Sequence, residues 1–234
     1  MECALPVRRI RAVLFDAGNT LLHMDYAAIA ARLSIGGPAV AAGDVEEAEL
    51  RARVLLDRDL AAGASTESRD THGRYLRYVL GHLGIAGDER VEEIARWRAA
   101  YNPPFGLWMR ASEAEAALRR VKSAGLMAGV ISNSNGSVRA ILEAIGLARH
   151  LDVIVDSAVV GVEKPDPRIF EIALREAGVA APAACYVGDL YSVDVLGARR
   201  AGLDAVLLDP RGYWGSRDCL TARSLDDAVS LCLG

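Results

Sequence analysis

Five short apolar segments recur along this chain of 234 residues, and they limit the folds that it can adopt. They are rich in Val, Leu and Ile, each ends in a turn or acidic residue, and they lie at 11–15, 127–131, 152–156, 184–188 and 204–209. Continuous apolar runs of this length are typical of parallel strands that are buried on both faces of a sheet. Helical patterns follow in alternation, so we predict an α/β fold with a doubly wound, Rossmann-like parallel sheet.

The helical patterns of this predicted core lie at 112–124, 137–146, 167–177 and 193–201. The first begins with Ser112 and has Glu115 three positions later, which predicts a helix N-cap. The last two are each followed by a glycine, the residue that most often ends a helix.

The segment between the first and second predicted strands is long and contains no convincing strand. Residues 25–108 are rich in Ala, Leu, Arg and Glu, with breaks at 36–38, 63–65, 84–87 and 103–104. This pattern predicts a bundle of about four helices inserted into the sheet domain. We therefore expect a helical cap domain at 25–108 and a catalytic core formed by 1–24 and 109–234.

Composition narrows the classes of partner and compartment. The net charge of -4 and the pI near 5.6 give no reason to expect nucleic acid or an anionic membrane as a partner, and no apolar run has the length of a membrane span. Four cysteines are scattered without a CxxC pair, at Cys3, Cys185, Cys219 and Cys232. Scattered thiols suit a reducing cytoplasm better than a disulfide scaffold. We expect a cytoplasmic monomer or homodimer, two states that the sequence does not distinguish.

Distinctive polar residues lie at or soon after the ends of four of these five segments. In a parallel sheet such positions gather at one edge, where ligands bind. They are Asp16 to Thr20, Ser132 to Asn135, Gly161 to Pro167, and Gly188-Asp189 with Asp194 beyond.

Together these groups suit phosphoryl transfer. A carboxylate such as Asp16 can attack phosphorus, and Asp16 and Asp189 with a backbone carbonyl make an oxygen site for Mg²⁺. Lys164 supplies a fixed positive charge, and the Ser132 hydroxyl with neighbouring backbone N–H groups can hold a phosphate oxygen. Lys122 is the only other lysine in a chain that otherwise uses arginine, which suggests that a compact ammonium is needed at position 164.

The order FDxxxT, an apolar run ending in Ser-Asn, GxxKPDP and GDxxxxD resembles the haloacid dehalogenase superfamily, in its phosphatase branch with a cap inserted after the first motif. The resemblance spans residues 11 to 209. It implies a Mg²⁺-dependent hydrolase of a small phosphorylated metabolite that works through an aspartyl-phosphate. It further implies a nucleophile and metal ligand at Asp16, metal ligands at Asp189 and the Gly18 carbonyl, phosphoryl-binding groups at Thr20, Ser132, Asn133 and Lys164, and a carboxylate beside metal and lysine at Asp194.

One position departs from the phosphatase pattern. Phosphatases of this superfamily have a second aspartate two residues after the nucleophile, which protonates the leaving group, and this chain has Gly18 there. Three interpretations remain open. The substrate has a good leaving group, such as an acyl phosphate; a residue such as His23, Asp25 or Tyr26 replaces the acid; or turnover is slow and the chain is a phosphoryl-binding or regulatory protein.

Other interpretations compete for the same residues. Haloacid dehalogenases also lack the second acid, but a metal-binding Asp189 would serve no purpose in them. Ser132 could be a helix N-cap and Asp194 a charge at a helix N-terminus. His72 is expected at the surface or in packing. Trp97, Arg98, Tyr101 and Trp108 are candidates for lining a substrate cavity, although the aromatic residues are explained more simply as core.

Overall fold

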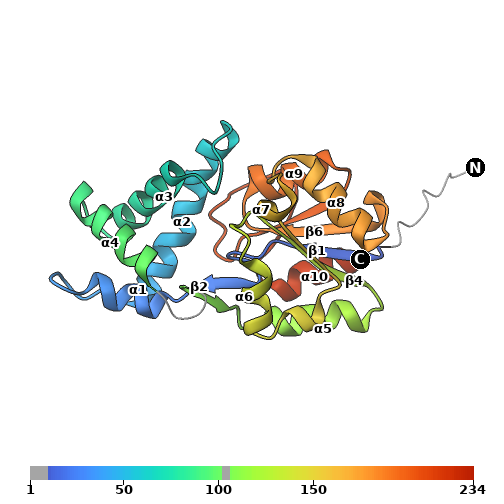
Figure 1. Ribbon diagram of the computed structural model, residues 1–234, viewed down its shortest axis with the longest axis horizontal. Coiled ribbons are helices and arrows are strands. Elements are labelled where there is room, and N and C mark those ends of the chain that lie inside the picture. The colour runs from blue at the N-terminus through green and yellow to red at the C-terminus, as the bar shows by residue number, and fades with distance from the viewer. Residues whose placement is uncertain (1–9, 102–105) are drawn as a thin grey trace, which may run out of the picture.

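The computed structural model describes residues 10–101 and 106–234, and its centre is a six-stranded parallel sheet (Figure 1). The strand order is β5-β4-β1-β6-β7-β8. The strands are β1 (Ala12–Phe15), β4 (Met127–Ser132), β5 (Val153–Asp156), β6 (Ala184–Gly188), β7 (Asp204–Leu208) and β8 (Leu220–Ala222). The predicted Rossmann-like α/β fold is confirmed, and β1, with its last residue next to Asp16, lies between β4 and β6.

Helices cover both faces of this sheet, as the doubly wound pattern predicts (Figure 1). Successive side chains of a strand point to opposite faces, so Phe15 and Val130 enter one apolar cluster while Leu14 and Ile131 enter the other. The first cluster is closed by α5 (Ala114–Ser123), α6 (Val138–Ala144) and α10 (Leu225–Leu233), and the second by α8 (Pro167–Ala177) and α9 (Leu196–Arg200). A short helix α7 (Ser157–Val160) and 3₁₀ turns at Ala148–His150 and Ala181–Ala183 complete the connections.

The described part of the long segment after β1 forms four helices, as its composition predicts. They are α1 (Tyr26–Leu33), α2 (Ala42–Ala61), α3 (Arg69–His82) and α4 (Asp88–Ala100), and they stand beside the sheet domain (Figure 1). Residues such as Leu33, Leu80 and Ile94 give these inserted helices an apolar core of their own. The breaks at 36–38, 63–65 and 84–87 all fall between helices, whereas the predicted break at 103–104 lies outside the described residues.

The structure corrects several local predictions. Helix α5 begins at Ala114 after Glu113, so Ser112 is not its N-cap; the carboxylate of Glu113 accepts a hydrogen bond from the backbone N–H of Leu225 instead. Two three-residue strands, β2 (Leu22–Met24) and β3 (Trp108–Arg110), pair antiparallel where the insertion leaves and rejoins the core. Helix α9 follows a π-helical turn, Tyr191–Val195.

The cysteines also differ from the expectation of scattered thiols. Cys185 of β6 and Cys232 of α10 form a disulfide, because α10 packs on the sheet face toward which Cys185 points. Cys219 is a free thiol, and Cys3 lies outside the described residues. The argument from unpaired thiols to a reducing compartment therefore loses its basis. No described helix has both the length and the apolar character needed to cross a membrane.

Candidate active site

A cavity of about 300 Å³ lies where the carboxyl ends of the strands face the inserted helices. Seven of the eight predicted site residues line it: Asp16, Gly18, Ser132, Asn133, Lys164, Asp189 and Asp194. Thr20 is the exception. Its side chain is buried, its Oγ1 has no hydrogen-bond partner among the described residues, and it borders a different surface pocket.

Lys164 occupies the centre of the site, where it is 3% exposed. Its Nζ donates to Oδ1 of Asp16 at 2.5 Å, to Oδ1 of Asp194 at 2.8 Å and to the hydroxyl of Tyr186 at 2.9 Å. Tyr186 in turn donates to the carbonyl of Ile131 at the end of β4. All three donors of the ammonium are therefore used, which fixes its position.

Asp194 joins the fourth motif to the lysine. While its Oδ1 accepts from Lys164, its Oδ2 accepts from the backbone N–H groups of Asp189 at 3.1 Å and Leu190 at 2.9 Å. This close packing requires Gly188, since a Cβ there would overlap Cγ of Asp194. Asp194 is thus a buried centre of the loop and not only a helix-terminal charge.

The three aspartates form the group of carboxylates best placed to hold a cation. Asp16, Asp189 and Asp194 are all buried, and each offers an oxygen within 4.8 Å of the others. Burial raises the pKa of Asp16 to about 6, against the lowering effect of Lys164. Burial likewise raises the pKa of Asp189, against the charge of Arg53. Burial alone would lower the pKa of Lys164, but Asp16 and Asp194 raise it well above its usual range.

Asn133 and Ser132 hold the second and third motifs together. The Asn133 side chain accepts from the backbone N–H of Lys164 at 2.7 Å and donates to its carbonyl at 2.9 Å. Its amide also donates to Thr66 Oγ1 at 2.9 Å. The Asn133 side chain is therefore engaged in placing the lysine backbone. Ser132 is the buried last residue of β4, and because α6 begins only at Val138, Ser132 is not an N-cap.

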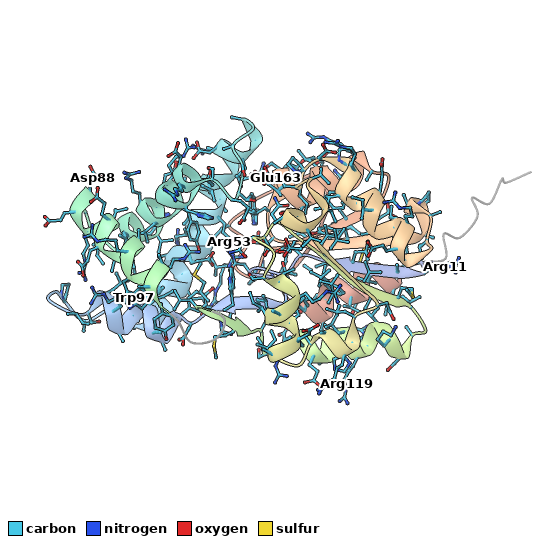
Figure 2. The ribbon with its side chains drawn as sticks, viewed as in Figure 1. Arg11, Arg53, Asp88, Trp97, Arg119 and Glu163 are labelled. Atoms are coloured by element: carbon cyan, nitrogen blue, oxygen red, sulfur yellow. A yellow bond between two sulfur atoms is a disulfide. The ribbon has the colours of Figure 1, made fainter. Side chains whose placement is uncertain are left out.

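Arg53 of α2 enters the site and was not predicted. Figure 2 shows it between the inserted helices and the sheet, where its Nη1 donates to Oδ2 of Asp189 at 2.9 Å and its Nε to Oε1 of Glu49 at 2.7 Å. Both acids are 2% exposed at their side chains. Tyr75 donates to Oε1 of Glu49 at 2.8 Å, which holds the carboxylate in place.

Helix α2 makes a second buried contact with the same loop. Oδ1 of Asp57, one turn beyond Arg53, accepts from the backbone N–H of Ser192 at 2.8 Å and from its hydroxyl at 2.5 Å. Between α2 and α3, Ser65 donates to Oε2 of Glu163 at 2.9 Å. With the contact of Thr66 to Asn133, the inserted segment is thus hydrogen-bonded to three of the four motif loops.

Gly18, where phosphatases have an acid, is closed off by an aromatic ring. A Cβ at this position would lie 3.1 Å from Cη2 of Trp108, and Trp108 lines the cavity. The three residues predicted as stand-ins for the acid lie elsewhere. His23 contacts the Met24 carbonyl, Asp25 caps α1, Tyr26 donates to Glu49, and none of them lines this cavity.

The inserted helices contribute polar groups to the cavity that no motif identified. Among them are Glu67, His72, Tyr75 and Arg98. Of the candidates named from composition, Arg98 and Trp108 do line the cavity, whereas Trp97 packs in the core of the inserted helices. His72 was expected only at the surface or in packing. It is exposed, and it also faces the cavity.

Comparison with known proteins gives a consistent family. The family model of haloacid dehalogenase-like hydrolases matches residues 10–202. Haloacid dehalogenase-like hydrolase domain-containing protein 3 of Bos taurus is 28% identical over 206 residues, covering 86% of this chain and 82% of that protein. Glyceraldehyde 3-phosphate phosphatase of Methanothermobacter thermautotrophicus is 30% identical over 225 residues, covering 94% and 95%. The crystal structure of the L-2-haloacid dehalogenase RSc1362 superposes with a TM-score of 0.64 at 22% identity, covering 97% and 100%, which shows a shared fold.

Proposed function

The chain belongs to the haloacid dehalogenase-like hydrolase family, and we propose that within it the protein is a Mg²⁺-dependent phosphatase of a small phosphorylated metabolite. The observation that carries this proposal is the buried cluster at the sheet edge, in which Lys164 joins Asp16 to Asp194 beside Asp189. The lysine offers a fixed positive charge to an anionic substrate, and the carboxylates offer oxygen ligands for a metal ion that would screen their own charge. A relative that aligns along almost the whole chain is named as a phosphatase.

The residues fit a divalent cation. Oxygen ligands suit Mg²⁺, and the charged side chains of the cluster carry a surplus of two negative charges, with the carboxylates of Asp16, Asp189, Asp194 and Glu49 around the cations of Lys164 and Arg53. We propose that Asp16, Asp189 and the Gly18 carbonyl hold the metal. Bound there, Mg²⁺ would neutralise phosphate charge during attack by an anion.

The protein groups divide the reaction between them. Asp16 attacks phosphorus, the bond from phosphorus to the leaving oxygen breaks, and an aspartyl-phosphate forms that water then hydrolyses. Lys164, held by Asp194 and Tyr186, keeps its positive charge against the phosphoryl oxygens. Ser132 supplies a hydroxyl at the end of β4. Asn133 acts by positioning Lys164.

The site has no acid at position 18 that could protonate the leaving group. The indole of Trp108 fills the space beside Gly18, so no carboxyl group faces the leaving oxygen from that loop. We propose that activated phosphates, such as acyl phosphates, react fastest. For other esters, Glu67 and His72 offer a carboxyl group and an imidazole from the inserted segment at the cavity wall as proton donors.

We propose that the inserted helices act as a cap domain, spanning 25–108, over a core of 1–24 and 109–234. Two observations support this proposal. Helix α2 makes hydrogen bonds to the loop at 189–192, and α3 and α4 provide part of the cavity wall.

A 2-haloacid dehalogenase is the second candidate, because a solved dehalogenase shares this fold, and the family resemblance implies that dehalogenases also lack an acid at the position of Gly18. The structure favours it less. The carboxylates of Asp16, Asp189 and Asp194 outnumber the cations Arg53 and Lys164 that pair with them, so the cluster would repel the carboxylate of a haloacid unless a metal ion were also bound.

The test is release of inorganic phosphate from acetyl phosphate and p-nitrophenyl phosphate, with MgCl₂ or with EDTA. We expect activity in MgCl₂ alone and its loss in Asp16→Asn. The matched control is Asp88→Asn, because the Asp88 side chain is 82% exposed on α4. Equal rates for wild type and Asp16→Asn, or no release by either, would refute the phosphatase. Chloride release from 2-chloropropionate in EDTA tests the dehalogenase.

A further inference from the structure

Arg98 of α4 is half-buried and lines the cavity, and its guanidinium makes no hydrogen bond or ion pair to any other described residue. Its neighbours on the same helix behave differently. Arg90 donates to Glu93 at 2.5 Å and to the carbonyl of Leu33 at 3.0 Å, and Arg96 pairs with Glu92 at 3.7 Å. The other cations of the cavity wall, Lys164 and Arg53, are bound to carboxylates as well.

An unpaired guanidinium in a partly desolvated place has five donors and no acceptor. Where water does not reach these donors, leaving them without partners costs free energy, so an anionic ligand would be stabilised there. Its charge acts on the cavity wall. Desolvation at the cavity wall lowers the pKa of His72, and the charge of Arg98 lowers it further. Burial raises the pKa of Glu67, which also lines the cavity, and the charge of Arg98 acts against that rise, although the two side chains form no ion pair among the described residues.

The position of Arg98 relative to the inserted helices matters. It lines both the large cavity and a smaller one of about 30 Å³. The wall of the smaller cavity comes almost entirely from the inserted helices, through residues such as Tyr26, Val45 and Tyr75. Asp16 and Lys164 line only the larger cavity. Arg98 therefore belongs to the part of the site within the inserted helices, while the phosphoryl-binding groups belong to the sheet edge.

We propose that Arg98 binds a second oxyanion on the substrate, so that the substrate class is phosphomonoesters carrying a carboxylate or a second phosphate. This inference rests on the proposed function, because it assumes that the first phosphoryl group is bound at Asp16. A planar guanidinium fork matches both oxyanions through paired hydrogen bonds. Arg98 would act on specificity and binding, at a distance from the bond that breaks.

The experiment compares substrates that differ in the second anion. The carboxylate arm sets 3-phosphoglycerate against glycerol 3-phosphate, and the phosphate arm sets fructose 1,6-bisphosphate against fructose 6-phosphate. In Arg98→Met we expect KM for the preferred substrate with two anionic groups to rise about 10- to 100-fold with kcat nearly unchanged, as loss of a charged hydrogen bond predicts. The p-nitrophenyl phosphate rate should stay within about twofold. Whichever arm shows the rise identifies the oxyanion.

Two further variants make the result specific to the fork. Arg98→Lys keeps the charge and loses the paired geometry, so its KM should fall between wild type and Arg98→Met. Arg96→Met, on the same helix with a side chain 72% exposed, is the matched control and should match wild type. Equal losses on the two members of a pair, or unchanged KM in Arg98→Met for both 3-phosphoglycerate and fructose 1,6-bisphosphate, would overturn the inference.

Failure of the proposed function is distinguishable from failure of this inference. If wild type releases no phosphate from p-nitrophenyl phosphate or acetyl phosphate, the phosphatase itself is wrong. If wild type is active and Arg98→Met does not discriminate, only the role of Arg98 is wrong. Calorimetric titration of 3-phosphoglycerate and fructose 1,6-bisphosphate into Asp16→Asn, with and without Arg98→Met, measures the same contact without turnover. If Arg98→Met changed the affinity for neither 3-phosphoglycerate nor fructose 1,6-bisphosphate in the Asp16→Asn background, the inference would also be overturned.

Discussion

Replacing Gly18 by aspartate would restore a carboxyl group two residues after Asp16, but Trp108 stands in its way. A Cβ at Gly18 would lie 3.1 Å from Cη2 of the indole and 3.7 Å from Cζ2 and Cζ3. The nearest of these is closer than an ordinary contact, and the carboxyl adds three more atoms. Because Trp108 packs partly against the main apolar cluster, we expect Gly18→Asp to lose about 1–3 kcal/mol, the usual cost of overpacking.

The activity of this variant should not improve while the indole remains. The assay is kcat/KM across a series of aryl phosphates, from p-nitrophenyl to phenyl, with the melting temperature measured alongside. For Gly18→Asp we expect a lower melting temperature and no gain on phenyl phosphate. For Gly18→Asp combined with Trp108→Leu we expect a gain on phenyl phosphate of about 10²-fold, the lower end of what a general acid supplies.

The controls separate space from chemistry. Trp108→Leu alone should leave the dependence on the leaving group unchanged, because it opens the space without adding an acid. A tenfold gain by Gly18→Asp alone, with an unchanged melting temperature, would refute the reasoning, since it would show that the indole does not occupy the position of the acid.

Three further predictions concern the buried polar groups. Arg53→Met removes the cation paired with Asp189, and in EDTA it should cost about 3–5 kcal/mol in urea unfolding, with a smaller loss in MgCl₂; a loss under 1 kcal/mol in EDTA would contradict it. Because burial raises the pKa of Asp16 to about 6 from an ordinary 3.8, the unfolded carboxyl ionises first, so the melting temperature in EDTA should fall between about pH 4 and 6. Asp16→Asn should flatten that fall, and a rise in the wild type would disprove the effect. Asp57→Ala leaves two donors of Ser192 unpaired and should cost about 1–3 kcal/mol in urea unfolding, whereas an unchanged midpoint would show that water replaces the carboxylate.

Much of the sheet could be predicted from sequence, because strands buried on both faces are continuous apolar runs. The strands β1, β4, β5, β6 and β7 agree with their predicted positions to within about one residue at each end. The strands β2 and β3 could not be found in this way. Each has three residues, too few for a period of two, and their partners are more than 80 positions apart in the chain.

The residues of the candidate site likewise fall into those that could be predicted from sequence and those that could not. Asp16, Lys164, Asp189 and Asp194 follow strands of one sheet, so the fold alone brings them together. Arg53 reaches the site on a helix. Nothing in its local pattern separates it from other arginines, because its role depends on how α2 packs over the loop at 189–192. Trp108 is a similar case, since a contact between Gly18 and a residue 90 positions later has no signature in spacing.

Helix α2 also has a consequence for protein engineering. Besides Arg53 and Asp57, it carries Arg51, whose guanidinium lies 4.3 Å from the ring centre of Tyr213. One helix therefore contacts the core at both the 189–192 loop and the turn after β7. Modular exchange of the inserted helices between relatives would separate these partners. A chimaera that receives the helices of a relative would need matching residues at 189–192 and 213, or buried donors and charges at this interface would lose their partners. These residues of the core therefore determine which inserted helices it can accept.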